Sequence, residues 1–557
     1  MPTSSEHLVI GEDDSLVPSP WNSALKVSEA ADYCAQVYKE IVPELAQSLN
    51  AIHGISCPDR YWQILLGPWL LHFITILYDR YQRIENACLK HPGLYTHILP
   101  EEQRRLATFD TYDFISVRGQ ATQDYYNLKL FSSIMEFLHS DKIVYTELNI
   151  PDSTSGALPK NSLRNKIGAS LLRFYEHFTA GPIILSDMYH LTYAQLFWLH
   201  AKLRFKTIKL KNFKNHTNRF DNKNAYSEAL RKEFKFEKKT DKFLVLLYHL
   251  LPQSIPLCYL ENFSLYRNRV KNVATTTVVG SSVGWYFNEN FKYFAAEALL
   301  NKARLVDFQT GGGYGISLNI PAETLSFEKD FFYAWGLPAK ESHEKIITLP
   351  SPYLSKLHNA HLPKNNNILM IGNGTHKYLC RFQSYMLPDD MPKYFNDKYI
   401  FLKSLNRSIL DRLYYRPYQE IGWRELETIK KMQLGIKFLS KGKLTTEMKK
   451  AKLVIIDHQS TSYIEAFIIN VPCVCFWDHD IYTVRPEVEK YFDKLRKAGI
   501  LYKTPQKAAK KVNEIFDDPL HWWMSPEIQE AKNLFCNNFA VTSKKWSEEW
   551  KKELSKI

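Results

Sequence analysis

The apolar positions of this chain follow a helical spacing over its first hundred or so residues. Between about residues 30 and 106 they recur every three or four positions, as at Tyr38, Ile41 and Leu45. This spacing places them on one face of a helix, so it predicts several helices packed together. Residues 124–139 repeat the pattern and predict one more helix.

Short β-branched runs alternate with helical stretches further along the chain. Strands are expected at residues 182–186, 275–280, 303–308, 367–372, 452–456 and 473–477, and helices at 395–405 and 462–469. Such alternation is typical of parallel sheets flanked by helices. A break after Trp335 separates the first three strands from the last three. The pattern therefore predicts two α/β halves joined near residue 338.

Residues 64–78 form a nearly unbroken apolar run that has to be tested as a membrane span. A helix needs about 20 apolar residues to cross a bilayer. This run is shorter and contains Pro68 and His72. We therefore interpret it as a buried helix of a soluble protein.

The two ends of the chain add a lead and a tail to the two halves. The first thirty residues are polar and proline-bearing without periodicity, so they are expected to be mobile. Residues 505–550 are helical in pattern, and their tryptophans and phenylalanines could return to pack on the first half. The expected division is a mobile lead at 1–30, a first domain at 31–337, a second domain at 338–520 and a helical tail at 521–557.

The charge and the cysteine content limit the partners and the cellular location that we expect for the protein. The 557 residues carry a net charge of +13, which suits an anionic partner such as a phosphorylated donor, a membrane face or nucleic acid. The basic clusters at 206–214 and 231–242 lack a nucleic-acid-binding motif. One interpretation is that these clusters are solvent-exposed faces without a specific role. The other is that they contact anionic lipid headgroups. The eight cysteines are scattered, and with no export signal at the start they indicate buried thiols and a cytoplasmic location.

The strongest chemical signal in the second half follows the strand at 452–456. The carboxyl end of this strand delivers Asp457 and His458 to the crevice where open α/β sheets bind ligands. A polar loop and a helix come next, with the expected ligand-binding residues Ser460, Thr461, Ser462 and Glu465. Free N–H groups at a helix start favour phosphate oxygens, and a carboxylate one turn on can accept both ribose hydroxyls. The alternative is an ordinary helix cap with a solvated glutamate.

Three further residues are candidates for contact with the nucleotide phosphates. Arg485 follows the next strand and could close a second contact on phosphate. Arg381 and His376 lie after the glycine-containing loop that ends the strand at 367–372. Each of the three, taken alone, could equally be a structural residue.

In the first half, a glycine loop follows the strand at 303–308. Its residues are Gln309, Thr310, Gly311, Gly312, Gly313 and Tyr314, with Gly315 next. The spacing fits neither a dinucleotide fingerprint nor a P-loop, so a tight structural turn is one interpretation. The other is a substrate loop, because Glu323, Glu328 and Asp330 follow closely. Carboxylates in that position can serve as base or nucleophile in group transfer to a hydroxyl.

A weaker acceptor site is suggested by Asp124 and Asn127, which share a face of the helix expected at 124–139. An exposed helix start explains Asp124 equally well. The sequence has no HExxH, no GxSxG and no Cys/His pair with metal spacing. We therefore expect neither a metal ion nor another cofactor.

Together these segments resemble a known family, the transferases encoded in bacterial surface-polysaccharide clusters. The resemblance runs in order from about residue 33 to 550. It is carried by Arg60 to Trp69, Asp79-Arg80-Tyr81, Gln309 to Gly315, Ala334-Trp335-Gly336, Asp457 to Glu465, Phe476-Trp477-Asp478, Arg485-Pro486-Glu487, Tyr491-Phe492-Asp493 and Trp522-Trp523. That family is distantly similar to CDP-glycerol glycerophosphotransferases and to Kdo-type and pseudaminic-acid-type glycosyltransferases.

The resemblance implies a GT-B fold, in which two Rossmann-type domains face a cleft. The donor nucleotide would lie on the second domain, and the acceptor would lie between the domains. Ser460, Thr461 and Glu465 match the nucleotide-site pattern, and Gly311 to Gly315 match the glycine loop. The family commonly has a histidine where this chain has Thr310. If that histidine is the base, Glu323, Glu328 or Asp330 would have to take over its role.

The expected function is a metal-independent glycosyltransferase at the inner face of the cytoplasmic membrane. It would move a sugar, a nonulosonic acid from a CMP-sugar, onto a glycan or lipid-linked glycan of a capsule or O-antigen. One alternative is a CDP-alditol phosphotransferase on the same scaffold. Another is a non-catalytic binding protein of glycan assembly, which the threonine at position 310 would favour.

Overall fold

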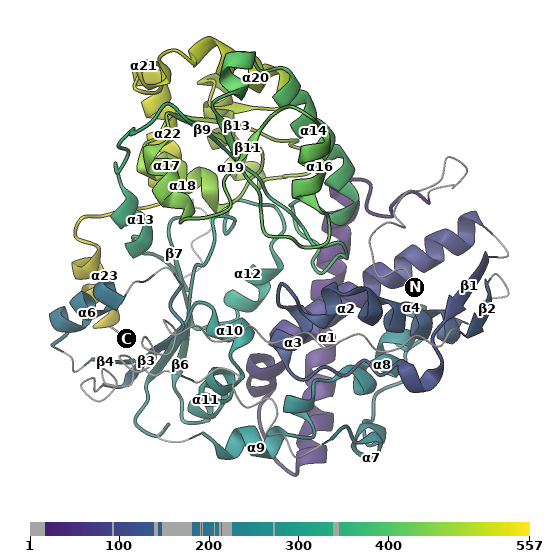
Figure 1. Cartoon of the computed structure of the whole chain (residues 1–557). Helices are drawn as coiled ribbons and strands as arrows, with labels where there is room; N and C mark the ends of the chain where they lie inside the picture. The colour runs from purple at the N-terminus through teal and green to yellow at the C-terminus, as the bar shows by residue number, and fades with distance from the viewer. Residues whose placement is uncertain are drawn as a thin grey trace.

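The chain forms two α/β lobes with a helical segment packed on the first (Figure 1). The computed structural model describes residues 17–91, 94–138, 143–147, 181–189, 191, 193–204, 207–210, 213, 225–270, 273–337 and 345–556. Each lobe is built on a six-stranded sheet in which every strand pair is parallel. Parallel sheets need helices on both faces, and both sheets have them.

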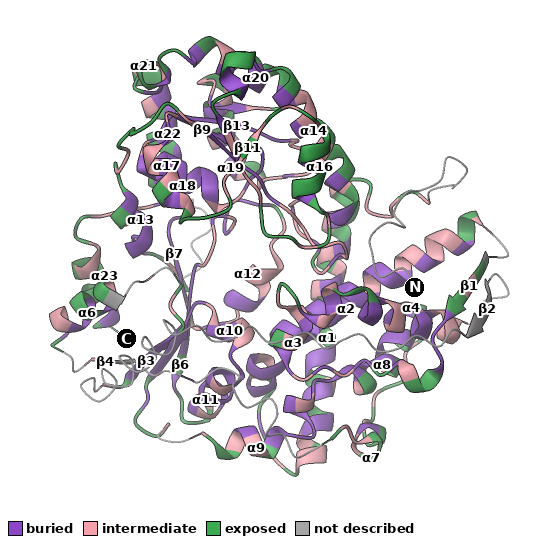
Figure 2. Cartoon of the chain, in the orientation of Figure 1, coloured by how far each residue is buried: buried purple, intermediate pink, exposed green. Residues whose placement is uncertain are grey.

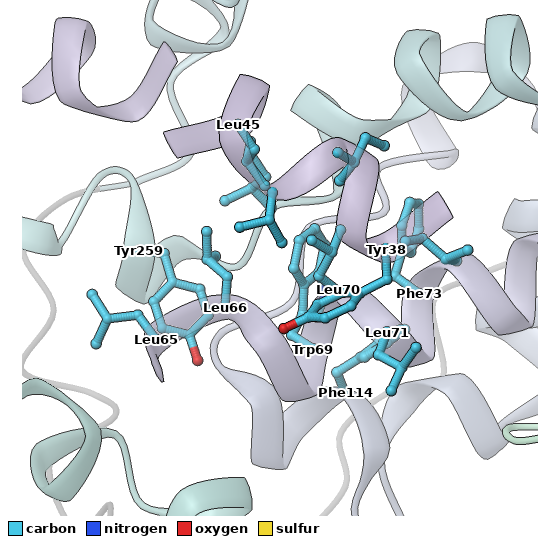
Figure 3. Packing of buried hydrophobic residues seen from close by; sticks show 14 of the residues in the cluster. Tyr38, Leu45, Leu65, Leu66, Trp69, Leu70, Leu71, Phe73, Phe114 and Tyr259 are labelled. Atoms are coloured by element: carbon cyan, nitrogen blue, oxygen red, sulfur yellow. The ribbon is translucent and has the colours of Figure 1, made fainter. Parts of the chain in front are cut away.

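The helical segment is led by two long helices, α1 (Ala24–His53) and α2 (Asp59–Lys90). Ser23 caps the start of α1, and Gly54 ends it with a φ of 63°, a backbone conformation that glycine adopts without strain. The apolar run at 64–78 lies inside α2, where Leu65, Leu66 and Trp69 pack beside residues of α1 (Figure 3). Among the described helices, none is both long and apolar enough to cross a membrane. Every residue of the run from Ile64 to Leu77 is buried, which confirms the buried-helix interpretation.

Shorter elements complete this segment. They are α3 (Thr111–Ile115), α4 (Asp124–Leu138), α7 (Glu228–Lys232), α8 (Lys242–Ser254), α9 (Phe263–Asn268) and a two-stranded parallel sheet of β1 (Leu94–Ile98) and β2 (Ile143–Glu147). The helix predicted at 124–139 is thus present as α4. The basic cluster at 231–242 is only partly exposed, because Arg231 is buried in an ion pair with Glu261. The cluster at 206–214 lies mostly outside the described residues.

The first sheet has the strand order β4-β3-β5-β6-β7-β8. Its strands are β3 (Ile183–Ser186), β4 (Ile208–Leu210), β5 (Val278–Ser281), β6 (Arg304–Phe308), β7 (Phe331–Ala334) and β8 (Ile346–Thr348), with helices α6 (Tyr193–Lys202), α10 (Gly284–Phe287), α11 (Glu289–Leu300) and α12 (Pro321–Ser326). Alternate strand residues face opposite ways, so Leu305 joins the core under α1 and α2 while Val306 joins the core under α6. The helical segment thus covers this face over β3, β5 and β6, whereas Phe332 and Ala334 of β7 pack against the loop residue Tyr314 and Ala322 of α12.

The second sheet has the strand order β11-β10-β9-β12-β13-β14. Its strands are β9 (Ile368–Ile371), β10 (Leu413–Arg416), β11 (Lys437–Phe438), β12 (Leu453–Ile456), β13 (Cys473–Phe476) and β14 (Leu501–Tyr502). The surrounding helices are α13 (Pro352–Leu357), α14 (Met391–Lys403), α15 (Arg407–Leu410), α16 (Glu425–Lys431), α17 (Leu444–Lys450), α18 (Thr461–Ile469), α19 (Pro486–Lys497) and α20 (Pro505–Ile515). Numbered within the domain, the order is 3-2-1-4-5-6, the order of the Rossmann fold.

The tail joins the two lobes. After α21 (Pro519–Trp523), helix α22 (Pro526–Phe539) packs on α18 and α19 of the second lobe. The chain then crosses back, and α23 (Trp546–Leu554) lies beside α6 of the first lobe (Figure 1). Trp550 stacks on Phe308 with ring centroids 5.3 Å apart. The predicted return of the tail to the first domain is confirmed.

The strands and helices predicted from the pattern are present, but two boundaries differ. Helix α1 begins at Ala24, and Val27 and Ala30 are already buried, so order starts earlier than the predicted residue 30. Residues 1–16 lie outside the described residues. The first sheet also continues past residue 338, because β8 at 346–348 pairs with β7. Strand β5 of the first sheet and strands β9 and β12 of the second are buried at every residue (Figure 2), which is why their apolar runs could be recognised.

Candidate functional site

The candidate site lies at the carboxyl ends of β9 and β12. Strand order reverses between these two strands, and in open α/β sheets the crevice outside such a switch point is where ligands bind. Asn373 follows β9 and Asp457 follows β12, and both side chains are buried. Asn373 donates its backbone N–H to the Tyr394 hydroxyl at an N···O distance of 2.8 Å, and this hydroxyl donates to Asp457 Oδ1 at 2.9 Å. The two strand ends are therefore joined through one tyrosine.

Helix α18 begins beside this crevice. Ser460 is its N-cap, with extended backbone, and its Oγ accepts the Ser462 N–H at 3.3 Å. Ser460 and Thr461 are half-buried, whereas Ser462 is buried. The helix is nine residues long, so its first turn carries N–H groups without partners inside the helix, of which Ser460 caps one, and the positive end of the helix dipole. The predicted serine-capped helix start is therefore present, and its binding of an anion stays a prediction.

Asp457 and His458 lie beneath these serines, and they contact them through the imidazole of His458. The imidazole Nδ1 of His458 lies 2.9 Å from Asp457 Oδ1, and its Nε2 lies 3.0 Å from Ser462 Oγ. Ser462 Oγ lies 2.7 Å from Ser460 Oγ. Asp457 and His458 are only 3% and 2% exposed, so they form the floor of the site instead of its ligand-facing surface.

A buried lysine lies deeper in the same network. Lys398 Nζ donates to Tyr394, Tyr415 and Glu425 and lies 3.4 Å from Asp457 Oδ2. Burial by itself would raise the pKa of Asp457, but the Lys398 ammonium and the hydrogen bonds of His458 and Tyr394 hold it below its ordinary value. Asp457 is therefore a carboxylate at neutral pH.

Glu465 lies on the next turn of α18. The Tyr353 hydroxyl donates to it at 2.6 Å, and burial raises its pKa to about 7. Burial raises the pKa of the Tyr189 hydroxyl in the first lobe, and the nearby Glu465 raises it further. Tyr189 belongs to the first lobe and is half exposed, whereas Glu465 belongs to the second lobe. The Glu465 carboxyl group therefore lies near the interface between the lobes. A carboxylate there could accept two ribose hydroxyls.

The glycine loop of the first lobe touches the start of α18. Gly312 donates its N–H to Thr461 Oγ1 at 3.0 Å. A Cβ on Gly312 would lie 2.6 Å from Ile464 Cδ1, which could turn aside, and 3.2 Å from Thr461 Cα, so a larger residue would have to displace the start of the helix by a few tenths of an ångström. Gly315 has a φ of 68°, and a Cβ there would lie 1.7 Å from Leu337. The loop thus contacts the second lobe at Gly312, and its role as a substrate loop stays a prediction.

The remaining loop residues hold the loop from within. The Gln309 amide donates to the Gly311 carbonyl at 2.7 Å and accepts the Trp335 N–H at 2.7 Å. Tyr314 stacks on Phe332, and burial raises the pKa of its hydroxyl to about 12, with smaller opposing effects from hydrogen bonds with Thr310 and Ser326. Gly313 also packs closely, since a Cβ would lie 3.0 Å from Ile320. Tyr314 is therefore a core residue of the loop.

Glu323 and Arg485, predicted for different roles, are paired with each other. Arg485 forms an ion pair with Glu323, and Glu323 also accepts the Gly315 N–H at 2.7 Å. The Arg485 Nε donates to the Ser317 carbonyl at 3.3 Å. The pair joins α12 of the first lobe to the start of α19. In this state both charged groups have partners in the protein.

A comparison with protein families identifies the chain. The profile of the LIC12162 family transferase matches residues 4–554. The chain belongs to this family. The expected resemblance to a transferase family is confirmed, whereas the more distant similarity to CDP-glycerol and Kdo transferases stays a prediction. A comparison with curated proteins finds no match.

Solved structures give weaker similarities to this LIC12162 family transferase. The UDP-N-acetylglucosamine 2-epimerase of Listeria monocytogenes has 11% identity and a TM-score of 0.38 over 65% of this chain and 94% of its own. Spinosyn forosaminyltransferase SpnP has 10% identity and a TM-score of 0.33 over 68% and 100%. Acinetobacter baumannii MurG has 12% identity and a TM-score of 0.34 over 67% and 99%. The parallel two-sheet architecture described above rests on the strand pairing itself.

The other two acids near the loop have different surroundings. Glu328 is half-buried, accepts from the Tyr38 hydroxyl at 3.4 Å, and has a pKa raised by burial. Together with Glu323 it lines a cavity of about 780 Å³ beside α1. Asp330 instead precedes β7, where it binds Arg60 and accepts the Leu305 N–H at 2.7 Å. These contacts fix the amino-terminal ends of β6 and β7, whereas the glycine loop lies at the carboxyl-terminal end of β6. They give Asp330 a structural role.

Arg381 and His376 lie on the loop after β9. Arg381 is exposed, and within the described part of the chain it has neither a hydrogen bond nor an ion pair. Burial and the charge of Arg381 lower the pKa of His376 to about 4. The same two causes lower the pKa of His72 of α2 to about 3. Arg381 therefore lies between the lobes as a cation that can accept an anionic ligand.

The weaker acceptor site predicted on α4 is occupied by protein contacts. Asp124 is exposed, and Lys377 and Tyr378 of the second lobe donate to it at 2.9 and 2.7 Å. Asn127 is fully buried, and its Oδ1 accepts from Arg80. Both residues thus help to join α4 to its neighbours. Within the described ranges, no group of three His, Cys, Asp or Glu residues has the arrangement of a metal site.

Several residues of the site were not identified from the sequence. Lys398, Glu425 and Tyr394 come from α14 and α16 and meet only because the sheet folds them together. Asp307 on β6 accepts from Ser326 at 2.7 Å, and burial raises its pKa to about 7. An acid inside an apolar strand was the one available clue to Asp307. A polar residue at a buried strand position is expensive unless it is hydrogen-bonded.

Proposed function

We propose that this LIC12162 family transferase is a glycosyltransferase that takes its sugar from a nucleotide-activated donor. The observation that carries the proposal is the contact of the first lobe's glycine loop with the start of α18, through Gly312 and Thr461. One side of this contact offers helix N–H groups for the donor phosphates and Glu465 for the ribose. The other side brings an acceptor domain to the same point.

The donor proposed here is a CMP-sugar of a nonulosonic acid, and the acceptor is a surface glycan or lipid-linked glycan. A nonulosonic acid carries a carboxylate besides the nucleotide phosphate. Arg381, exposed and without a partner in the described structure, is suited to that second negative charge. Work at the inner face of the cytoplasmic membrane would fit the net charge of +13.

Leaving-group stabilisation is the main catalytic demand in this reaction, because a nucleotide phosphate departs with its charge. The start of α18 and Arg485 would supply it. A phosphate at Arg485 would compete with Glu323 for the guanidinium. Glu323 would then be released as a carboxylate base for the acceptor hydroxyl, the role that a histidine at position 310 cannot fill in this chain.

Nucleotide binding is the first test. The unfolding temperature would be measured with CMP, CDP and UDP, because a ligand that binds the folded state raises apparent stability. Stabilisation by CMP is the expected result. No stabilisation by any nucleotide would contradict the proposal and favour a non-catalytic binding protein.

Transfer is the second test. The enzyme would be incubated with a CMP-nonulosonic acid or with CDP-glycerol, with a cell-envelope glycan fraction as acceptor, and CMP release would be followed. Release from the CMP-sugar alone supports glycosyl transfer, and release from CDP-glycerol alone identifies the alditol phosphotransferase instead. Glu323→Gln should keep donor binding and lose transfer. Asp330→Asn is the matched control, since this acid lies at the amino-terminal ends of the strands, away from the glycine loop.

A further inference from the structure

We propose that Asp457, His458, Ser462 and Ser460 form a hydrogen-bond relay that couples the binding of a nucleotide phosphate to the uptake of a proton by His458. The inference rests on the proposed function, because it needs a phosphate at the start of α18. It assigns His458 a positioning role for the leaving group. Its evidence is the unbroken chain of contacts from the buried carboxylate to the half-buried hydroxyl.

The direction of each hydrogen bond follows from what each atom can donate. Asp457 is a carboxylate and can only accept, so the His458 Nδ1, 2.9 Å away, must carry a hydrogen. In a neutral imidazole Nε2 is then an acceptor, and it takes the hydroxyl hydrogen of Ser462 at 3.0 Å. Ser462 Oγ in turn accepts from Ser460 at 2.7 Å. In this state both hydroxyl hydrogens point inward.

Adding one proton to His458 reverses the chain. The Nε2–H then donates to Ser462 Oγ, and Ser462 donates to Ser460 Oγ. The Ser460 hydroxyl hydrogen is free to point outward to an anion at the helix start. The step takes one proton from water onto Nε2, and the only other changes are rotations of two hydroxyl groups.

The charges around the relay favour this uptake when an anion binds. The buried network contains two carboxylates, Asp457 and Glu425, and one ammonium, Lys398. The tyrosines near Asp457, which are Tyr385, Tyr394, Tyr415 and Tyr482, all have pKa values raised by burial and stay neutral. An imidazolium would balance the remaining negative charge. In the empty site the positive end of α18 opposes it, and a bound phosphate would remove that opposition.

The predicted consequence for the reaction is a stronger hold on the departing phosphate. A hydroxyl that donates to a charged oxygen forms one of the stronger hydrogen bonds in proteins. In the protonated relay the Ser460 hydroxyl is free for the anion, whereas in the neutral relay it would have to give up its hydrogen bond to Ser462 Oγ to make the same contact. His458 would therefore act through Ser462 and Ser460 without touching the substrate.

The test is calorimetry with CMP as the probe at pH 7.5, in buffers with different heats of ionisation. The slope of the binding enthalpy against the buffer ionisation enthalpy gives the number of protons taken up. On binding CMP, the wild type should take up more protons than His458→Gln, and the difference should be at most one proton per protein. Glu465 and the phosphate of CMP also titrate near this pH, but they contribute equally to both proteins, so the difference isolates His458.

Two further variants separate the relay from a merely structural histidine. Ser462→Ala keeps His458 but breaks the chain, so it should lose the extra uptake and weaken CMP binding about tenfold. His361→Gln is the matched control, because His361 binds the Ala451 carbonyl ahead of β12, and it should behave like the wild type. CMP binding with equal proton uptake in wild type and His458→Gln would overturn the relay alone. Failure of CMP, CDP and UDP to bind would overturn the relay and the proposed function together.

Discussion

The protonation of Glu465 is coupled to the stability of the fold. Its folded pKa is about 7, against an ordinary value of 4.5, because it is buried beside Tyr353. The folded protein therefore binds a proton at this site between pH 4.5 and 7 that the unfolded chain releases. This contribution to stability is fully present below pH 4.5 and is lost as the pH rises through about 7.

The change Glu465→Gln tests this linkage. Glutamine resembles the protonated acid and does not titrate, so the variant should lose less stability than the wild type between pH 5 and pH 8. The difference should be on the order of 3 kcal/mol. Unfolding temperatures and urea midpoints at both pH values provide the measurement. Glu447→Gln, which removes a partly exposed carboxylate from a surface ion pair with Lys450, is the control and should follow the wild-type profile.

At the scale of elements, the join between the glycine loop and α18 depends on a missing side chain. Gly312→Ala would place a Cβ 2.6 Å from Ile464 Cδ1, which would have to turn aside, and 3.2 Å from the Thr461 backbone, which would have to separate slightly from the loop. We expect a loss of stability of about 1–3 kcal/mol, together with a loss of transfer larger than the loss of nucleotide binding. Gly311→Ala is the matched control, because its Cβ would lie 3.7 Å from the nearest atom, Thr461 Oγ1. Equal transfer rates in the two variants would show that the join has no role in the reaction.

The elements themselves were largely predictable, whereas their contacts were not. Strand β12 and helix α18 have local signatures, a continuous apolar run and a serine cap, and those signatures depend on neighbouring residues alone. The network under Ser462 has no such signature, since Lys398 meets Asp457 from 59 positions earlier in the sequence. The same limit explains Glu323 and Arg485. Each was recognised as a charged residue near a loop, but their pairing across 162 positions depends on how the lobes dock.

For the whole molecule, that ion pair is a measurable link between the lobes. Both side chains are largely buried, with 16% and 8% exposure for Arg485 and Glu323. A double-mutant cycle with Arg485→Met and Glu323→Gln should give a coupling energy of about 1–3 kcal/mol in unfolding experiments. The surface pair Lys511 and Glu514 is the control cycle and should give less than about 1 kcal/mol. A coupling no larger than this control would mean that the pair does not hold the lobes together.

The tail is the second link, because it starts on one lobe and ends on the other. Trp550 is 5% exposed, stacks on Phe308 of β6 and donates its indole N–H to the Pro350 carbonyl at 2.9 Å. Trp550→Ala removes these contacts and should cost about 3–5 kcal/mol. Because α22 keeps its own contacts on the second lobe, the loss should appear as faster hydrogen exchange in α23, α6 and β6 and should spare α18 and α22. Trp546→Ala, on the same helix but only partly buried, should have a smaller effect at the same sites. Uniformly faster exchange in both lobes would instead mean that the two lobes unfold as one unit, with the tail as part of a shared core.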